Sequence, residues 1–355
     1  MLKKALKISC IKKGCKSFML SNYAMNTFLG KSLLLIMFNV GLLTTISVMA
    51  EADKQESTDI IASIKPIQLL VDEIRGGTEM GEPLLHANQN HHLRTLKPSQ
   101  QRRINAAKHV FYISDEFEGY FRSIKRADSS PAAAFKYIEL GKINGIRLLS
   151  TRSNGALSHV YVKELKNNDS SAEVHNGHHH VSEIDWHLWL NPDNAILMLQ
   201  KIRDVLIETR PSMQQQYTTN YENAVIKITR QSQRIAEKMM DVMKVPFITL
   251  HDGYQYFEEQ YGLNSKGAIL RHDDDMTGVK RIQLMRRLIK DNGIRCVFKE
   301  AQYADKAIKP VIEGFDVSIM ELDSLGQSLS SDVRSYTQLM ENFAGSFYRS
   351  LSQDR

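Results

Sequence analysis

Cysteine is scarce in this chain of 355 residues, which contains only three. Two of them, Cys10 and Cys15, lie in a lysine-rich start, and Cys296 is the remaining thiol. Outside that start Cys296 is a single thiol, which cannot form an internal disulfide. A framework held together by disulfides is therefore excluded for the rest of the chain. No cysteine follows the apolar run at residues 32–46. A lipid-modified cysteine at that place is therefore excluded as a membrane anchor.

Arginine and acidic residues are absent from the first fifty residues, which contain seven lysines. An apolar run follows the lysines, and Val48-Met49-Ala50 carries suitable residues for cleavage by signal peptidase. We therefore expect residues 1–50 to be a signal peptide and the mature protein to be soluble in the periplasm. Met25 would begin a leader of more ordinary length. The alternative is an uncleaved anchor, although Asn39 and two threonines interrupt the run that a membrane span requires.

Basic residues are not in excess once the expected leader is removed. The whole chain has 46 basic and 40 acidic residues, and 46 − 7 leaves 39 basic against 40 acidic, a net charge of −1. Aromatic-interleaved basic patches are also missing, so we expect no nucleic-acid partner.

The remaining 305 residues (355 − 50) suffice for two domains of ordinary size. Short β-rich runs alternate with helical ones, which is typical of βαβ units and a mainly parallel sheet. Strands are expected at residues 60–64, 83–85, 110–113, 137–140, 245–250, 268–270, 296–298 and 317–322. Helices are expected at residues 67–74, 99–107, 277–289 and 333–351. The predicted fold is therefore α/β, with two Rossmann-like lobes at residues 51–210 and 245–355.

Glycine and proline are almost absent from the stretch between the lobes that follows Pro211. Apolar residues recur there at helical spacing, at Tyr217, Tyr221, Ala224, Ile228, Ile235 and Met239. We expect one long rigid helix within residues 211–244, spanning 213–243, with two shorter helices as the alternative.

Histidine is the residue type that points to chemistry. Four of the twelve histidines cluster at His175, His178, His179 and His180, and three others stand beside strand-like runs, at His92, His187 and His251. Neutral imidazole is the commonest side-chain ligand for divalent metals such as zinc. In open parallel sheets ligands bind beyond the carboxyl ends of the strands, and each of the three single histidines, together with Asp323, is expected there. One metal site in a cleft between the lobes is the resulting hypothesis.

Several motifs then resemble one family, the ZnuA-like periplasmic zinc-binding proteins of ABC importers. The resemblance covers most of the mature chain. Its motifs are Ile61-Ala62-Ser63-Ile64-Lys65-Pro66, His92 with Leu96-Lys97-Pro98-Ser99, His187-Leu188-Trp189-Leu190-Asn191-Pro192, His251-Asp252-Gly253-Tyr254, Cys296-Val297-Phe298-Lys299-Glu300-Ala301-Gln302 and Leu322-Asp323-Ser324-Leu325-Gly326.

The resemblance implies that His92, His187 and His251 bind Zn²⁺ as the transported cargo, with Asp323 or water as the fourth ligand. It also implies that residues 167–183 match the family's histidine-rich loop, although this loop is short. His91 and the four clustered histidines are auxiliary candidates. The implied partner is the permease of an ABC importer, and we expect a monomer. Ser346 stands where relatives carry a cysteine that pairs with the equivalent of Cys296.

Two alternatives to zinc transport remain. Three imidazoles with at most one carboxylate suit tetrahedral zinc, whereas manganese prefers more oxygen ligands, so a manganese or other divalent-metal protein of the same family is the first alternative. A zinc hydrolase is the second, but it needs a general base near the metal. No His-Glu-x-x-His motif occurs, and Lys299 would pair with Glu300, so we expect no enzyme.

Overall fold

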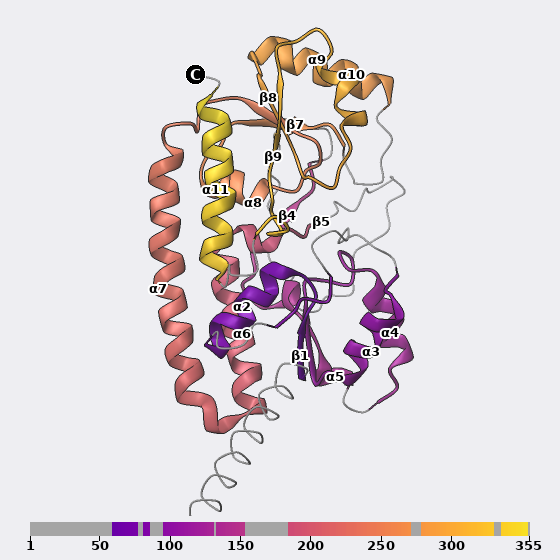
Figure 1. Cartoon of the computed structure of the whole chain (residues 1–355), viewed down its shortest axis with the longest axis vertical. Coiled ribbons are helices and arrows are strands. Elements are labelled where there is room, and N and C mark those ends of the chain that lie inside the picture. The colour runs from indigo at the N-terminus through magenta and orange to yellow at the C-terminus, as the bar shows by residue number, and fades with distance from the viewer. Residues whose placement is uncertain are drawn as a thin grey trace, which may run out of the picture. The chain divides into compact units, whose positions relative to one another are not determined.

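The computed structural model describes residues 59–76, 81–85, 95–130, 133–152, 184–270, 278–329 and 335–353. The expected signal peptide, His91, His92 and the histidine-rich loop lie outside these residues. The fold is α/β with parallel sheets in two lobes joined by a helix, as the sequence predicted (Figure 1). None of the helices in the described part of the chain is long and apolar enough to cross a membrane.

The first lobe contains a three-stranded parallel sheet in the order β1-β2-β3. Its strands are β1 (Ile60–Ala62), β2 (His109–Tyr112) and β3 (Tyr137–Glu139). Its helices are α2 (Lys65–Arg75), α3 (Pro98–Ala106), α4 (Tyr120–Ala127), α5 (Ala133–Lys136) and α6 (Pro192–Thr209). All three residues of β1 are buried, as expected for a parallel strand that is covered on both faces.

Residues 83–85 are not the strand that the sequence predicted. The chain bends there, and its amides at Leu84 and Leu85 donate to the carbonyls of Ala62 and Ser63, at 2.8 and 2.9 Å. Pro83 has no N–H group to extend this ladder. An antiparallel pair, β4 (Leu149–Ser150) with β5 (Ile184–Asp185), was not predicted.

The second lobe contains a four-stranded parallel sheet in the order β7-β6-β8-β9. Its strands are β6 (Phe247–Thr249), β7 (Ser265–Ala268), β8 (Cys296–Lys299) and β9 (Ser318–Glu321). Its helices are α8 (Gln255–Gln260), α9 (Val279–Asn292), α10 (Lys309–Ile312) and α11 (Tyr336–Ser352). Strand β7 begins three residues before the predicted strand at 268–270 and ends at its first residue, Ala268. Its register against β6 shifts between Phe247 and Thr249, and Gly267 in the same stretch has a φ of 130°.

The pleat of this sheet divides its side chains between two cores. Phe247 and Phe298 join the main core, in which Phe347 of α11 packs against both rings. Ile248 and Val297 face a smaller core with α9 and α10. Successive residues of a strand point to opposite faces, so both faces of β6 and β8 are buried. This fixes the strand whose carboxyl end leads to His251.

Helix α7 (Gln214–Met239) joins the lobes and is a single helix of 26 residues. Its length is about 39 Å at 1.5 Å per residue. Helices α2, α6 and α11 pack along it, and Figure 1 shows α7 beside α11. The helix ends four residues earlier than predicted, because the chain turns through Val242 and Met243 before Pro246, a residue that disfavours helix in the position preceding it.

Candidate metal site

His251 lies two residues beyond β6, the inner strand between β7 and β8. Leu250, the residue before it, donates to the carbonyl of Phe298 at 2.7 Å and accepts from the amide of Leu270 at 2.7 Å. The backbone is therefore held on both sides up to the residue that precedes the histidine. The His251 ring is buried, with ring centroids of Tyr254 and Tyr303 at 5.4 and 5.3 Å. Packing fixes the position of this imidazole.

His187 lies two residues beyond β5 and is held by a carboxylate. The Oδ1 atom of Asp185 accepts from the backbone N–H of His187 at 3.0 Å and lies 2.7 Å from its Nδ1. A carboxylate can only accept, so Nδ1 carries the proton and Nε2 keeps its lone pair. Such a carboxylate–histidine pair orients the ring and raises its basicity toward a metal. Sequence reasoning did not name Asp185, although the Asp-x-His spacing was there to be read.

The two imidazoles lie against each other at the junction of the lobes. Their ring centroids are 5.6 Å apart. The backbone of Gly253 lies close to both rings, because a Cβ atom there would stand 2.3 Å from Nε2 of His251 and 3.1 Å from Cε1 of His187. Any larger residue would fill the space in front of the ring nitrogens. Glycine keeps that space open.

His251 fits a metal ligand, because a neutral imidazole offers one nitrogen lone pair to an ion. Both ring nitrogens are buried and have no hydrogen-bond partner among the described residues. Buried polar atoms are nearly always satisfied, so an imidazole without a partner is consistent with a site for an ion that is bound through nitrogen. In the described part of the chain, His187 and His251 do not belong to any cluster of three or more histidine, cysteine or acidic residues. A third ligand would have to come from outside these residues, where His92 lies.

Asp323 lies two residues beyond β9, where the sequence placed it. Its carboxylate binds its own loop: Oδ1 accepts from the amide of Gln327 at 2.7 Å, and Oδ2 accepts from the amide and hydroxyl of Ser328 at 2.6 and 2.5 Å. Lys65 of the first lobe donates to the carbonyl of Leu329 in the same loop, at 3.3 Å. A ligand role for Asp323 remains a prediction.

Glu300, the candidate general base of a hydrolase, is buried and held by neighbouring side chains. Its carboxylate accepts from the hydroxyl of Ser324 at 2.5 Å and from the side-chain amide of Gln302 at 2.6 Å. The expected pairing with Lys299 is wrong. Lys299 instead binds Asp305 and Glu321, at 3.0 and 3.4 Å. Lys299 is the last residue of β8 and Glu300 lies just beyond it, so the two side chains take different partners.

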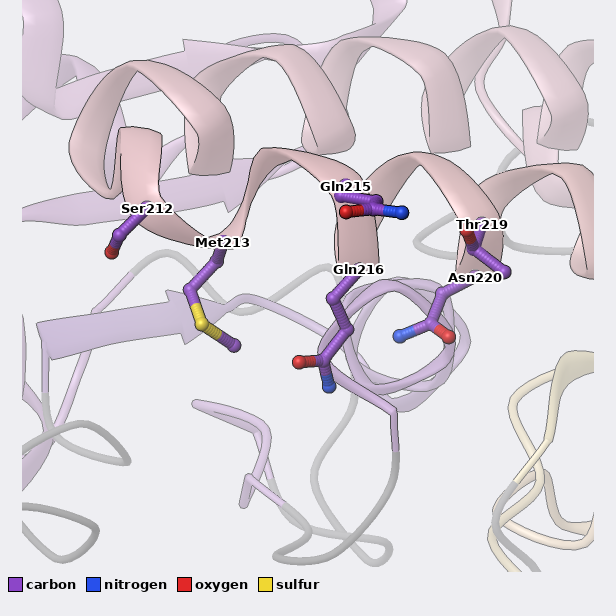
Figure 2. Close-up of a pocket in the computed structure, with 6 residues that line it drawn as sticks. All are labelled: Ser212, Met213, Gln215, Gln216, Thr219 and Asn220. Atoms are coloured by element: carbon purple, nitrogen blue, oxygen red, sulfur yellow. The ribbon is translucent and has the colours of Figure 1, made fainter.

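A hollow of about 370 Å³ lies elsewhere, where α6 leads into α7. Its lining residues are Ser212, Met213, Gln215, Gln216, Thr219 and Asn220 (Figure 2). None of these six carries a charge or an imidazole, and Asn220 already donates to the carbonyl of Ile74 at 2.9 Å. This hollow does not offer the ligands of a metal site.

The two parallel-sheet lobes, the joining helix and the paired imidazoles define a two-lobed, metal-binding type of solute-binding protein. The model of the family described as "Zinc-uptake complex component A periplasmic" (ZnuA) matches residues 60–349. The chain belongs to this family, as the motifs indicated.

A curated relative supports this assignment, and two solved structures have the same fold. The high-affinity zinc uptake system protein ZnuA of Brucella suis is 30% identical over 313 residues, covering 84% of this chain and 93% of that protein. A crystal structure of ZnuA has a TM-score of 0.65 at 20% identity and covers 82% of this chain and 98% of its own. A zinc-bound ZnuA deletion mutant has a TM-score of 0.63 at 21% identity, with coverages of 82% and 97%. These two structures share the fold.

Proposed function

We propose that this chain is a periplasmic zinc-binding protein that captures Zn²⁺ and delivers it to the permease of an ABC importer. Its transport role is supported by membership of a family described as the periplasmic component of a zinc-uptake complex. The observation that carries the metal-binding role is the buried His251 ring, whose two nitrogens have no partner among the described residues and which lies against His187.

The proposed ligands are His92, His187 and His251, with Asp323 or water completing a tetrahedral site. Zinc is the cargo and not a catalytic cofactor. A hydrolase would need a general base that is available to a metal-bound water. Glu300, the candidate general base, is held by Ser324 and Gln302, which favours binding over catalysis. We propose that the protein acts as a monomer whose leader, residues 1–50, is removed.

The proposed domain arrangement is two lobes, residues 51–210 and 245–355, on a rigid linking helix within 211–244. One apolar core runs through residues of both lobes and of α7, which supports rigidity. Small-angle scattering of apo and zinc-loaded protein should give nearly the same radius of gyration. A large compaction on loading, as in hinge closure, would contradict a rigid link.

The decisive test is elemental analysis of untagged protein from the periplasm, followed by calorimetric titration with Zn²⁺ and Mn²⁺. We expect about one tightly bound zinc per chain, because one set of three imidazoles makes one site. Co-purified manganese, or no tightly bound metal, would overturn the proposal. Titration of the Asp323→Ala variant identifies the fourth ligand. Weaker zinc binding would indicate Asp323, and unchanged zinc binding would indicate water.

The histidine-rich loop at residues 167–183 is proposed to hold additional zinc weakly through His175, His178, His179 and His180. Deletion of residues 174–181 should remove weak binding events and leave the tight one. Loss of the tight binding event would instead show that the loop supplies a ligand of the tight site.

A further inference from the structure

The short helix α8 of the second lobe binds the chain segments that carry both histidines. The hydroxyl of Tyr256 donates to the carbonyl of Asp185 at 2.8 Å and accepts from the amide of Leu149 at 3.0 Å. Gln255 donates to the second oxygen of Asp185 at 3.4 Å. The antiparallel pair β4–β5, and with it His187, is therefore attached to the lobe that carries His251.

Arg152 joins the same regions through charged groups. It lies two residues beyond β4, and its Nε atom is 2.8 and 2.9 Å from the two carboxylate oxygens of Asp252, the residue that follows His251. Its Nη1 atom lies 2.8 Å from Glu258 of α8. The backbone amide of Arg152 also donates to Asp252, at 3.3 Å. One guanidinium thus joins the His251 turn, α8 and the end of β4.

Burial makes this arrangement specific. The side chains of Arg152, Asp252 and Glu258 are 2%, 5% and 3% exposed. Moving charges out of water is expensive, and only good geometry compensates for it. The planar guanidinium binds a carboxylate with two nitrogens at once, so it fixes orientation as well as distance, which an ammonium group does not. Rotation of the Asp252 backbone, and hence displacement of His251, is opposed by these bonds.

We propose that Arg152 is a positioning residue for metal binding: through Asp252 and Glu258 it fixes the His251 imidazole relative to His187 and thereby raises zinc affinity without touching the ion. This inference rests on the proposed function. It predicts that affinity depends on a charge that lies beside the ligands and not among them.

A matched control is available in Arg147. It too joins the β4 region to α8, through an ion pair with Glu259, a residue of α8 and not of the turn that carries His251. Loss of Arg147 removes an ion pair between the same elements and leaves the Arg152–Asp252 bonds in place. A general loosening of the two lobes would therefore affect both arginine variants alike.

The experiment compares Arg152→Met, Arg152→Lys and Arg147→Met in the full mature chain. Zinc affinity is measured by competition with a chromogenic chelator, site geometry by the visible spectrum of bound Co²⁺, and folding by thermal unfolding. We expect Arg152→Met to bind zinc about 10- to 100-fold more weakly, the range for residues that support metal ligands, with an altered Co²⁺ spectrum. Arg152→Lys should recover part of the affinity. Arg147→Met should stay within about twofold of the unchanged chain.

The inference is overturned if Arg152→Met keeps the affinity and Co²⁺ spectrum of the unchanged chain, or if Arg147→Met loses as much. If Arg152→Met does not fold, Asp252→Asn decides. That variant keeps the side-chain shape and weakens only the Arg152 bond, so weaker zinc binding supports the inference and unchanged binding overturns it. Absence of zinc binding by the unchanged chain would count against the proposed function instead.

Discussion

The turns that carry His187 and His251 hold the same type of side chain in different ways. His187 follows a strand of two residues with one neighbouring strand, and a carboxylate, Asp185, binds both its backbone and its ring. His251 follows a strand with a neighbour on each side, and aromatic rings surround its imidazole. A short strand fixes its end poorly, so polar side chains complete the first turn. Backbone ladders and ring packing hold the second, together with the bonds from Arg152 to Asp252.

This comparison predicts where zinc affinity is vulnerable. The His187 side should respond to changes of charge and hydrogen bonding around Asp185. The His251 side should respond to removal of the ring or of the bonds that hold its turn. The following predictions, ordered from the largest effect on zinc binding to the smallest, test this difference.

Replacement of His251 by alanine should have the largest effect. A tetrahedral site cannot readily replace one of three imidazoles, so we expect affinity to fall by more than about 100-fold, the upper range for supporting residues. The fold should survive, because the ring nitrogens of His251 make no hydrogen bond within the described residues. Calorimetry measures affinity, and circular dichroism measures folding.

His109→Ala is the control for this change. His109 begins β2 and contacts the hydroxyl of Thr209 at 2.7 Å and the carbonyl of Phe135 at 3.2 Å, so it belongs to no proposed metal site. Its loss should leave zinc affinity unchanged. Tight zinc binding by His251→Ala would show that the ligand assignment is wrong.

The sequence predicted the second turn better than the first, for a physical reason. His251 follows an apolar run that forms an inner parallel strand, and the rule that ligands bind beyond the ends of such strands applied directly. The pair β4–β5 has only two residues in each strand, too few for any periodic pattern. Arg152 was missed because its role depends on Asp252 and Glu258, which are distant in sequence, whereas the partner of Asp185 lies only two residues away. Position along the chain does not reveal the contacts of Arg152.

The fold was predicted wherever runs were long enough to show a period. Helix α7 and its buried residues followed from apolar spacing, while its end was set by turn chemistry before Pro246. Residues 83–85 looked like a strand because they are apolar, yet their amides bond to the end of β1 and their carbonyls accept from side chains of α3. Short apolar runs do not distinguish a strand from a buried bend.

Replacement of Asp185 by asparagine should have a smaller effect than loss of His251. Asparagine keeps the shape and can still accept from Nδ1–H, but it removes the charge that makes the imidazole more basic. We expect zinc affinity to fall about 10- to 100-fold, as for other residues behind a metal ligand. Competition titration measures the change, with Asp204→Asn on α6 as a control, because Asp204 binds only the neighbouring Arg203 among its described contacts. Equal affinities of the two variants would mean that the carboxylate does not tune His187.

The smallest effect on zinc, but a clear effect on stability, is expected for Glu118→Gln in the first lobe. Glu118 is buried and its Oε2 accepts from the amides of Ile113 and Ser114, at 2.7 and 3.3 Å. The adjacent Phe117 packs on the rings of His187 and Trp189, with centroids 5.5 and 5.8 Å away. Glu118 therefore reaches the metal site only through packing. Glutamine can accept the same amide bonds, so zinc affinity should change by less than about twofold.

The pKa of Glu118 determines how the stability of the protein should change with pH. Burial raises the pKa of Glu118 from an ordinary 4.5 to about 8. Between these values the folded protein keeps a proton that the unfolded chain releases. The contribution of Glu118 to the free energy of unfolding is therefore fully present below pH 4.5 and is lost as the pH rises toward 8. Between pH 5 and pH 8 this group should lower the free energy of unfolding of the unchanged protein by on the order of 3 kcal/mol, and the Glu118→Gln variant should not show this decrease. Urea unfolding measures both proteins. Parallel stability curves for the two proteins would show that Glu118 is ionised in the fold, with its charge accommodated by the two amides.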